Sequence, residues 1–358
     1  LENARYRLTV RPQRGAVVSW FDKELNRELA DPADEWGFGQ LLYASGGEGT
    51  RLVSNQADLP ERDPAVSGSF RLHQAELRRG VHGSAVVMRG DVPFGTAAIE
   101  WRLPAGASGP EVQYRCVKAE TTAKEAVYVA FPLNQAGGQV WSDSQAGWVR
   151  WDRDQLPGAC KEWLPLQTAV LSRREDGDVL IASPDIPLFC VGTVVQGRWP
   201  KEKDLTGGRL FSYLMNNYWH TNYKASQGGE IAFRYRLTSG SALTFQEAYR
   251  FGWQSRIGLY AHRISYQDFR HVQAPYADIG GGTLAAVESE DERIVASTIK
   301  RAEWAEGFII RLQDTSGEGG EARIAIPGRR IAAAWSQDLL ERDGPALEPE
   351  QDGSLRVR

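Results

Sequence analysis

The residues best suited to chemistry form an aromatic and amide-rich cluster in residues 216–223. The cluster combines side-chain amides, phenols, an indole and an imidazole: Asn216, Asn217, Tyr218, Trp219, His220, Asn222 and Tyr223. Amides and phenols can form paired hydrogen bonds with hydroxyl groups, and an indole offers a flat surface to the C–H face of a sugar ring. The cluster therefore favours contact with a carbohydrate, although Asn pairs and aromatic residues are also common in the turns of β proteins.

Paired carboxylates, the usual groups for cleaving a glycosidic bond, do not assemble into a catalytic set. A retaining glycosidase needs two acids on opposite sides of the bond, about 5 Å apart. Asp152 and Asp154 stand among tryptophans, but residues two apart on a strand share one face and do not flank a bond. We therefore predict that they shape a loop, and we assign no catalytic residue. The tryptophans of this region are Trp141, Trp148, Trp151 and Trp163.

Motifs for metal binding and nucleophilic catalysis are missing from the sequence. It contains no Gly-rich phosphate loop, GxSxG or HExxH, and its five histidines have no ligand spacing. Cys116, Cys160 and Cys190 are far apart and lack a CxxC pair, which argues against a zinc knuckle or a disulfide framework. Cys116 and Cys190 fall in apolar, strand-like runs, so we expect both to be buried. Such cysteine usage fits a reducing compartment.

The composition is that of a globular protein and argues against several partner classes. Of 358 residues, 42% are hydrophobic and 25% are charged, and the net charge is −4. This charge, without a dense Lys/Arg run, argues against a nucleic-acid partner. No apolar run approaches the roughly 20 residues needed to span a bilayer. The opening LENARYRLTV has neither an initiating Met nor a signal-peptide pattern, so we expect a segment of a longer polypeptide.

The elements that must position the aromatic-amide cluster are predicted to be strands. Ile231, Phe233 and Tyr235 follow the cluster and alternate with polar residues, as in a half-buried strand. A hairpin is expected in residues 1–30. The other expected strands are residues 37–43, 70–78, 84–90, 96–103, 111–120, 125–133, 166–172, 178–183, 187–195 and 209–215. Residues 44–68 predict a long loop, and residues 244–252 a short helix. The pattern predicts an all-β protein built on a large antiparallel β-sandwich.

A second, smaller unit is expected after a linker that bears Gly and Pro in residues 271–283. Its expected strands are residues 294–300, 307–313, 321–327 and 331–335. The sequence therefore predicts two domains, a large β-sandwich in residues 1–270 and a smaller β-sandwich in residues 271–358.

Several stretches resemble, in the same order, the C-terminal β region of glycoside hydrolase family 38 α-mannosidases. The most specific are MNNYWHTNY (215–223), QGG (227–229) and FRYRLT (233–238). Further matching stretches are YRLTV (6–10), DKELNREL (22–29), AVYVAFP (126–132), DQLPGA (154–159), ASPDIP (182–187) and residues 294–340, which end in DLLE. The resemblance covers nearly the whole chain and implies a galactose-mutarotase-like supersandwich followed by a smaller sandwich.

The resemblance implies that the catalytic parts of the enzyme lie outside this chain. Family members are retaining, zinc-dependent enzymes in which an α/β barrel carries a His-x-Asp zinc motif and an Asp nucleophile, and a helical domain adds a further His. This sequence contains no His-x-Asp, so no catalytic or metal residue is transferred to it. No cofactor is expected in this chain, and zinc is expected in the missing catalytic domain. The implied partners are that barrel and helical domain of the same polypeptide, and a mannose-containing carbohydrate.

Two physical roles are left for such a β region: a platform against the catalytic barrel, and a loop that completes the sugar pocket. Residues 216–223 are our prediction for that loop, and Asp154 and Trp163 are weaker candidates for sugar contact. Two alternatives stay open at this point. The chain could be a free-standing carbohydrate-binding module of the same sandwich type, or a mutarotase-like enzyme with a His and a Glu as acid and base.

Overall fold

The structure is a computed structural model that describes residues 1–46, 65–145, 147–194, 202–217, 224, 226–258, 285–289 and 293–358. It forms two compact units, Leu1–Ile257 and Gly258–Arg358. The sequence placed the domain boundary between residues 270 and 271. That position falls in residues 259–284, outside the described part of the chain.

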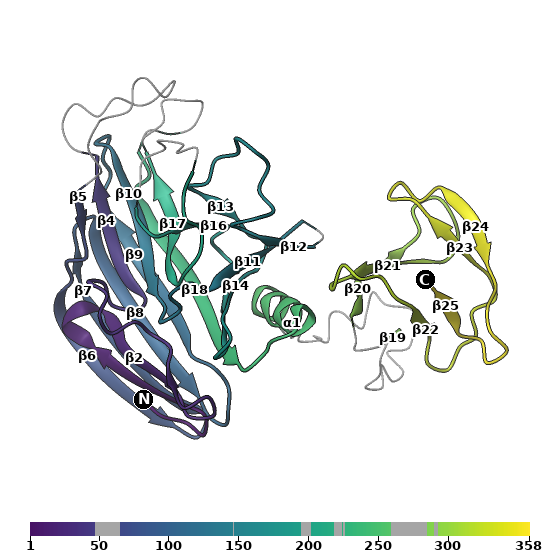
Figure 1. Ribbon diagram of the computed structural model, residues 1–358, viewed down its shortest axis with the longest axis horizontal. Helices are drawn as coiled ribbons and strands as arrows, with labels where there is room; N and C mark the ends of the chain where they lie inside the picture. The colour runs from purple at the N-terminus through teal and green to yellow at the C-terminus, as the bar shows by residue number, and fades with distance from the viewer. Residues whose placement is uncertain are drawn as a thin grey trace, which may run out of the picture. The chain divides into compact units, whose positions relative to one another are not determined.

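The large unit is a sandwich of two antiparallel sheets (Figure 1). The first sheet contains, in spatial order, β12 (Gly147–Arg150), β11 (Gln139–Ser144), β14 (Ala169–Arg173), β15 (Asp178–Ala182), β18 (Gly229–Gly240), β9 (Glu111–Lys118), β8 (Gly95–Pro104), β7 (Gly83–Val92) and β6 (Arg71–Gly80). The second contains β13 (Leu164–Pro165), β16 (Leu188–Val191), β17 (Arg209–Asn216), β10 (Glu125–Pro132), β4 (Gln40–Ser45) and β5 (Ala65–Ser67). The predicted all-β sandwich is confirmed.

Side-chain alternation explains how the two sheets form one core. In β8 the inward residues Ile99 and Trp101 are buried, whereas outward Arg102 is exposed. β10 is buried at every position because the core lies on one side and a second apolar cluster on the other. Aromatic rings join the sheets: the ring centroids of Phe131 and Tyr235 are 4.9 Å apart.

Two further elements complete the large unit. The predicted N-terminal hairpin consists of β1 (Tyr6–Arg11) and β2 (Ala16–Asp22), connected through the 3-10 turn η1 (Pro12–Arg14) and extended by β3 (Arg27–Glu28). The predicted helix is α1 (Phe245–Arg256), whose first turn is closed by a capping box between Thr244 and Glu247. It packs on the outer face of β14 and β15. In the described part of the chain, no helix has the length and apolarity to cross a membrane.

The small unit is built from short strands in three described sheets. These are β19 (Ala286–Ser289), β22 (Ala322–Ala325) and β25 (Leu355–Val357); β20 (Ile294–Arg301) and β21 (Phe308–Asp314); and β23 (Ala334–Gln337) and β24 (Asp343–Leu347). Its described core contains few buried apolar side chains: Ile294, Ala322, Ile324 and Leu355. The strand expected at 331–335 begins only at Ala334. The pair β11–β12, and also β13, β19, β24 and β25, were not predicted, and β5 lies within residues 44–68, which were predicted to be a loop.

Candidate functional site

The described part of the aromatic-amide cluster lies at one end of the large sandwich. β17 ends at Asn216, which pairs with Ala126 at the start of β10, and Glu125 pairs with Ser45 at the end of β4. Figure 1 shows these strand ends at the top of the unit. Strand pairing therefore places Asn216 and Asn217. The other predicted members of the cluster, Tyr218, Trp219, His220, Asn222 and Tyr223, lie outside the described residues.

Asn217 is held by the backbone of the turn before β10. Its side-chain Oδ1 accepts from the Glu125 N–H at 2.6 Å, and its Nδ2 donates to the Ala123 carbonyl at 2.5 Å. Its own N–H donates to the Glu125 carbonyl at 3.0 Å. On the far side of the cluster, the Ser226 hydroxyl accepts from the Thr121 N–H at 3.1 Å. The residues on both sides of segment 218–223 are thus anchored to one turn, residues 121–125.

A buried ion pair lies directly beneath this turn and joins the two sheets. The Lys118 ammonium at the end of β9 pairs with the Glu125 carboxylate, and the two side chains are only 2% and 4% exposed. Tyr43 of β4 lies next to the pair, where burial and then the neighbouring Glu125 carboxylate raise its pKa to about 12. The Tyr43 phenol is therefore neutral at physiological pH, and its hydroxyl is engaged with the Glu125 carboxylate.

Sequence reasoning missed this pair, although its signal is present. Lys118 continues the inward-facing alternation of Tyr114 and Cys116 in β9, and Glu125 opens a strand that is apolar almost throughout. A Lys and a Glu on buried strand positions each require a partner of opposite charge. What the alternation does not reveal is that the two residues meet across the sandwich.

The predicted contact residue Trp163 lies against the strand that leads into the cluster. It directly precedes β13, and its ring stacks on Tyr213 of β17 with centroids 5.4 Å apart and an interplanar angle of 21°. Tyr213 in turn lies 4.9 Å from Tyr128 of β10. The structure therefore brings Trp163 beside β17, three positions before Asn216. The half-buried Trp163 indole is thus the first ring in a row of three, followed by Tyr213 and Tyr128.

Asp154, the other predicted contact residue, is engaged within its own loop. Its carboxylate accepts from the Arg150 N–H at 2.9 Å and pairs with Arg153 at 2.9 Å. Asp152 forms a bidentate pair with the same Arg150 side chain. The hydrogen bonds to Arg153 lower the pKa of Asp154, so the carboxylate is charged near neutral pH. These contacts agree with the loop-shaping role expected for the two acids, and whether Asp154 also contacts sugar stays a prediction.

The cysteines and histidines offer no described metal centre. Cys116 and Cys190 are buried free thiols as expected, and burial raises the pKa of each to about 12. His73 and His82 are exposed, and His73 lies 3.1 Å from Asp91. Among the residues that the structure describes, no group of three or more His, Cys, Asp and Glu side chains could hold a metal ion.

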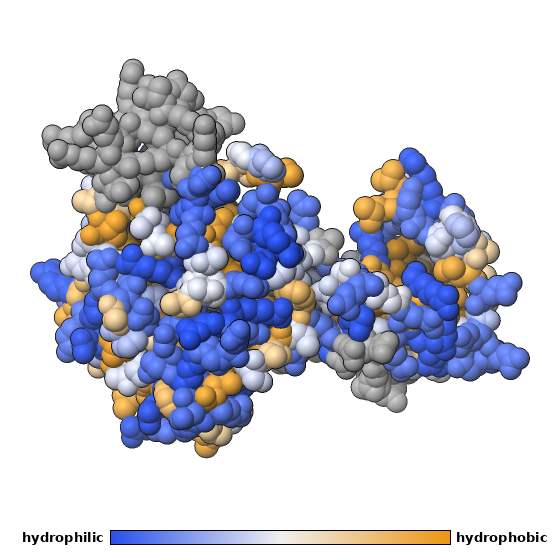
Figure 2. Space-filling view, in the orientation of Figure 1, coloured by the Kyte–Doolittle hydropathy of each residue, from blue (hydrophilic) through white to orange (hydrophobic). Residues whose placement is uncertain are grey.

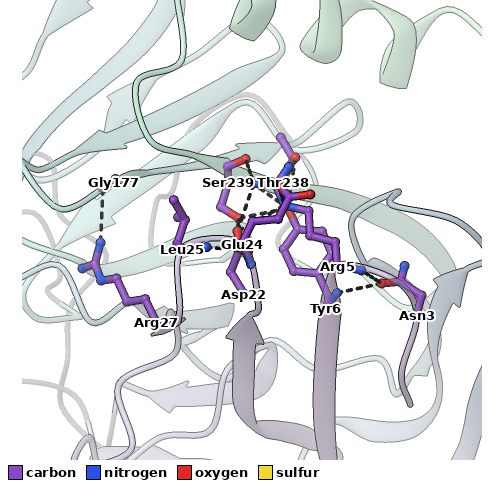
Figure 3. Close-up of polar contacts among 10 residues, drawn as sticks. All are labelled: Asn3, Arg5, Tyr6, Asp22, Glu24, Leu25, Arg27, Gly177, Thr238 and Ser239. Atoms are coloured by element: carbon purple, nitrogen blue, oxygen red, sulfur yellow. Dashed lines mark hydrogen bonds and ion pairs between the residues drawn. The ribbon is translucent and has the colours of Figure 1, made fainter.

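A second buried polar network anchors the N-terminal hairpin to β18 (Figure 3). Asp22, which has no exposed surface, pairs with Arg5 at 3.0 Å and accepts from the Ser239 hydroxyl at 2.6 Å. The Tyr6 hydroxyl lies 2.9 Å from the Ser239 hydroxyl. Although burial opposes ionisation, the hydrogen bonds from Arg5 and Ser239 lower the pKa of Asp22. The resembling stretch at 22–29 therefore begins with a residue that fastens the hairpin to the sandwich.

Sequence comparisons identify no relative for this chain. No family model matches it, and no curated protein matches it.

Comparison with solved structures finds proteins of similar fold over nearly the whole chain, and others that align over part of it. A protein in glycosyl hydrolase family 38 from Enterococcus faecalis aligns over 99% of this chain with a TM-score of 0.66 and 13% sequence identity. An alpha-mannosidase from Enterococcus faecalis aligns over 99% with a TM-score of 0.69 and 12% identity. This chain spans only 42% and 40% of the lengths of those chains. A galactose mutarotase-like protein from Lactobacillus casei aligns over 67% of this chain with a TM-score of 0.41.

Proposed function

We propose that this chain is the noncatalytic C-terminal β portion of a zinc-dependent, retaining α-mannosidase of glycoside hydrolase family 38. In this role it supports a catalytic barrel and contributes residues 216–223 to the mannoside pocket. The observation that carries the proposal is the alignment of both units, over 99% of the chain, with two-fifths of an alpha-mannosidase. The stretches that resemble the family in sequence are a further motive for the proposal.

The geometry at the end of the sandwich suits such a loop. A substrate-contacting loop whose two ends are already held in place loses less affinity to ordering on binding. Here Asn217 and Ser226 attach both sides of segment 218–223 to residues 121–125. The Lys118–Glu125 pair fixes that turn to both sheets. In our proposal Asn217 sets the base of the loop, while Asn216 and the following aromatic residues provide sugar contacts.

No residue of the described part is assigned to bond cleavage or to zinc. The buried carboxylate of Glu125 is committed to Lys118, and that of Asp22 to Arg5 and Ser239. A retaining mechanism needs two carboxyl groups that converge on one bond, and these two lie in separate networks. In our proposal both the nucleophile and the zinc ligands belong to the missing catalytic domain.

The first test is activity of the isolated chain. With an aryl α-mannoside and added zinc, the chain should show no turnover above that of a heat-denatured sample. Clear turnover would overturn the proposal, because it would require a catalytic set within these residues.

Calorimetric titration with mannose distinguishes the proposal from a free-standing carbohydrate-binding module. Such a module should bind with a Kd of about 1 mM or tighter, which corresponds to about −4 kcal/mol. Half a pocket should bind more weakly. The upstream reading frame gives a further test: a His-x-Asp barrel encoded there supports the proposal, and its absence contradicts it.

A further inference from the structure

A pocket at the turn between β6 and β7 is lined by basic side chains. It lies at the end of the large sandwich opposite the candidate site, because Arg102 pairs with Glu111 at the start of β9, whereas Lys118 ends that strand. Figure 2 shows this end of the large unit, at the bottom of the view, as mostly hydrophilic surface with smaller apolar areas. The pocket has a volume of about 310 Å³, and no described Asp or Glu lines it. Its basic lining residues are Arg78, Arg79, His82 and Arg102.

Strand register places two of these arginines on one face of the sheet, with a small residue between them. Arg78 of β6 pairs with Ala85 of β7, and Ala85 pairs with Arg102 of β8. Residues directly opposite each other in antiparallel strands point to the same face. The neighbours of Arg102 in β8, Trp101 and Leu103, are buried in the core, so this row faces outward. The row therefore has a low centre at Ala85 and a long basic side chain on each side.

The spacing of this row suits one small oxyanion. Neighbouring strands lie about 4.8 Å apart, so the backbones of Arg78 and Arg102 are separated by about 10 Å. An anion above Ala85 is then about 5 Å from each outer strand, within reach of both guanidinium groups. Each guanidinium can donate two parallel hydrogen bonds to a tetrahedral oxyanion, which makes arginine well suited to phosphate. The His82 imidazole, which also lines the pocket, is a further hydrogen-bond donor.

Neighbouring acids leave both arginines available to an anion. In the described part of the chain, the Arg102 side chain has no hydrogen bond or ion pair. Glu111, its cross-strand neighbour in β9, pairs instead with Arg236 at 3.1 Å. Arg78 pairs with Glu76 at 2.8 Å, but these two side chains are 50% and 43% exposed. An exposed ion pair contributes little free energy, so an anion can compete with Glu76 for Arg78.

Protection of a sheet edge accounts for only one of the two arginines. β6 is the edge strand of its sheet, and charged side chains on an edge discourage pairing with other chains. This explains Arg78 but not Arg102, because β8 lies inside the sheet between β7 and β9. We propose that the pocket is an anion site, which binds a phosphate group between Arg78 and Arg102.

Calorimetric titration of the full chain with inorganic phosphate at low ionic strength tests the site. Two charge-assisted contacts should give a Kd on the order of 1 mM. Arg102→Gln should raise this Kd at least about tenfold, because it removes one of the two guanidinium groups. Arg115→Gln is the matched control. Arg115 is exposed on the same sheet and lies outside the pocket lining, so its replacement should change the Kd far less.

Glu76→Gln gives a prediction of the opposite sign. It frees Arg78 from its carboxylate partner and removes a negative charge beside the pocket. Phosphate should therefore bind with a Kd about two- to fivefold lower than that of the unmodified chain. Circular dichroism checks that each variant is folded. If Arg102→Gln misfolds, the tighter binding of Glu76→Gln must be seen in its place.

Titration with glucose 6-phosphate identifies the source of the phosphate group. Tighter binding than that of inorganic phosphate assigns the site to a phosphate monoester, and equal or weaker binding assigns it to the free ion. The proposal is wrong if phosphate shows no saturable binding at millimolar concentrations, or if folded Arg102→Gln binds it like the unmodified chain. An equal loss of binding in Arg115→Gln would also refute it, because binding would then depend on general surface charge.

Discussion

Asp22 is a carboxylate with no exposed surface, and its contacts determine how it responds to pH. Its pKa is lowered in the folded chain, so it favours folding above its unfolded pKa of about 3.9, and this stabilisation is lost as the pH falls through the lower, folded value. Asp22→Asn should cost about 3 kcal/mol at neutral pH, because it leaves Arg5 and Ser239 with a poorer partner. Urea unfolding at neutral and acid pH measures both effects.

The control for Asp22 is a surface carboxylate that also pairs with an arginine. Asp91 contacts Arg71, whose side chain is 78% exposed. Solvent screens such a pair, so Asp91→Asn should change the free energy of unfolding far less than Asp22→Asn. If the two variants lose equal stability at neutral pH, the Asp22 network does not anchor the hairpin as described.

The Lys118–Glu125 pair makes a different prediction because both charges are buried. Glu125→Gln leaves the Lys118 ammonium without its counter-charge and should destabilise the large unit by about 3 kcal/mol. Replacing both, as Lys118→Met with Glu125→Leu, should cost clearly less than the single change, since no charge is then buried alone. Urea unfolding of the single and double variants gives the comparison. A double variant as unstable as the single one would contradict this account of the pair.

Gly252 lies within helix α1, where its packing against Thr168 matters more than the intrinsic helix propensity of the residue. Gly→Ala inside a helix normally gains about 1 kcal/mol. Here a Cβ would lie 2.1 Å from the Thr168 hydroxyl oxygen. That hydroxyl is buried and donates to Asp143, so it cannot move aside freely. Overpacking costs about 1–3 kcal/mol, so Gly252→Ala should lower stability by about 1 kcal/mol.

Thermal unfolding of Gly252→Ala beside Gln254→Ala tests this expectation. Gln254 is exposed on the same helix, where Ala replaces a residue of similar helix propensity and no clash arises. Its Tm should stay close to that of the unmodified chain. A higher Tm for Gly252→Ala would mean that the helix lies farther from β14 than the structure places it.

The sequence predicted best the strands in which buried and exposed residues alternate, and the helix that begins at a capping box. β8 and β9 bury every second residue, and α1 begins at a readable capping box. β11 and β12 were missed because their tryptophans and acids suggested a binding loop rather than strands. In fact Trp141 and Trp148 lie against Phe245 of α1, at centroid distances of 5.0 and 5.3 Å. That contact joins residues about 100 positions apart, which local patterns do not encode.

The sequence led us to propose residues 216–223 as a sugar-contacting loop, which stays a prediction, but it did not reveal the contacts that hold the residues on either side of that loop. The residue types at 216–223 pointed to hydroxyl-bearing ligands, and β17 does end at Asn216. The base of the site depends on contacts between strands that are distant in sequence, such as Lys118 with Glu125 and Trp163 with Tyr213. Which two residues meet in such a contact depends on the order and register of the strands. Composition and side-chain alternation do not determine that order or register.

The two units differ in how much apolar surface they bury, and hydrogen exchange should reveal the difference. β10 is buried at all positions and bonded on both sides by β4 and β17, so its amides should exchange only through global unfolding of the large unit. β20 and β21 form a two-stranded sheet with mostly half-buried or exposed residues. Their amides should therefore exchange at least about a hundredfold faster than those of β10, which corresponds to about 2.7 kcal/mol. Mass spectrometry of peptides measures the exchange of each strand. Equal protection of β10 and β20 would show that the small unit unfolds together with the large one, despite its few buried side chains.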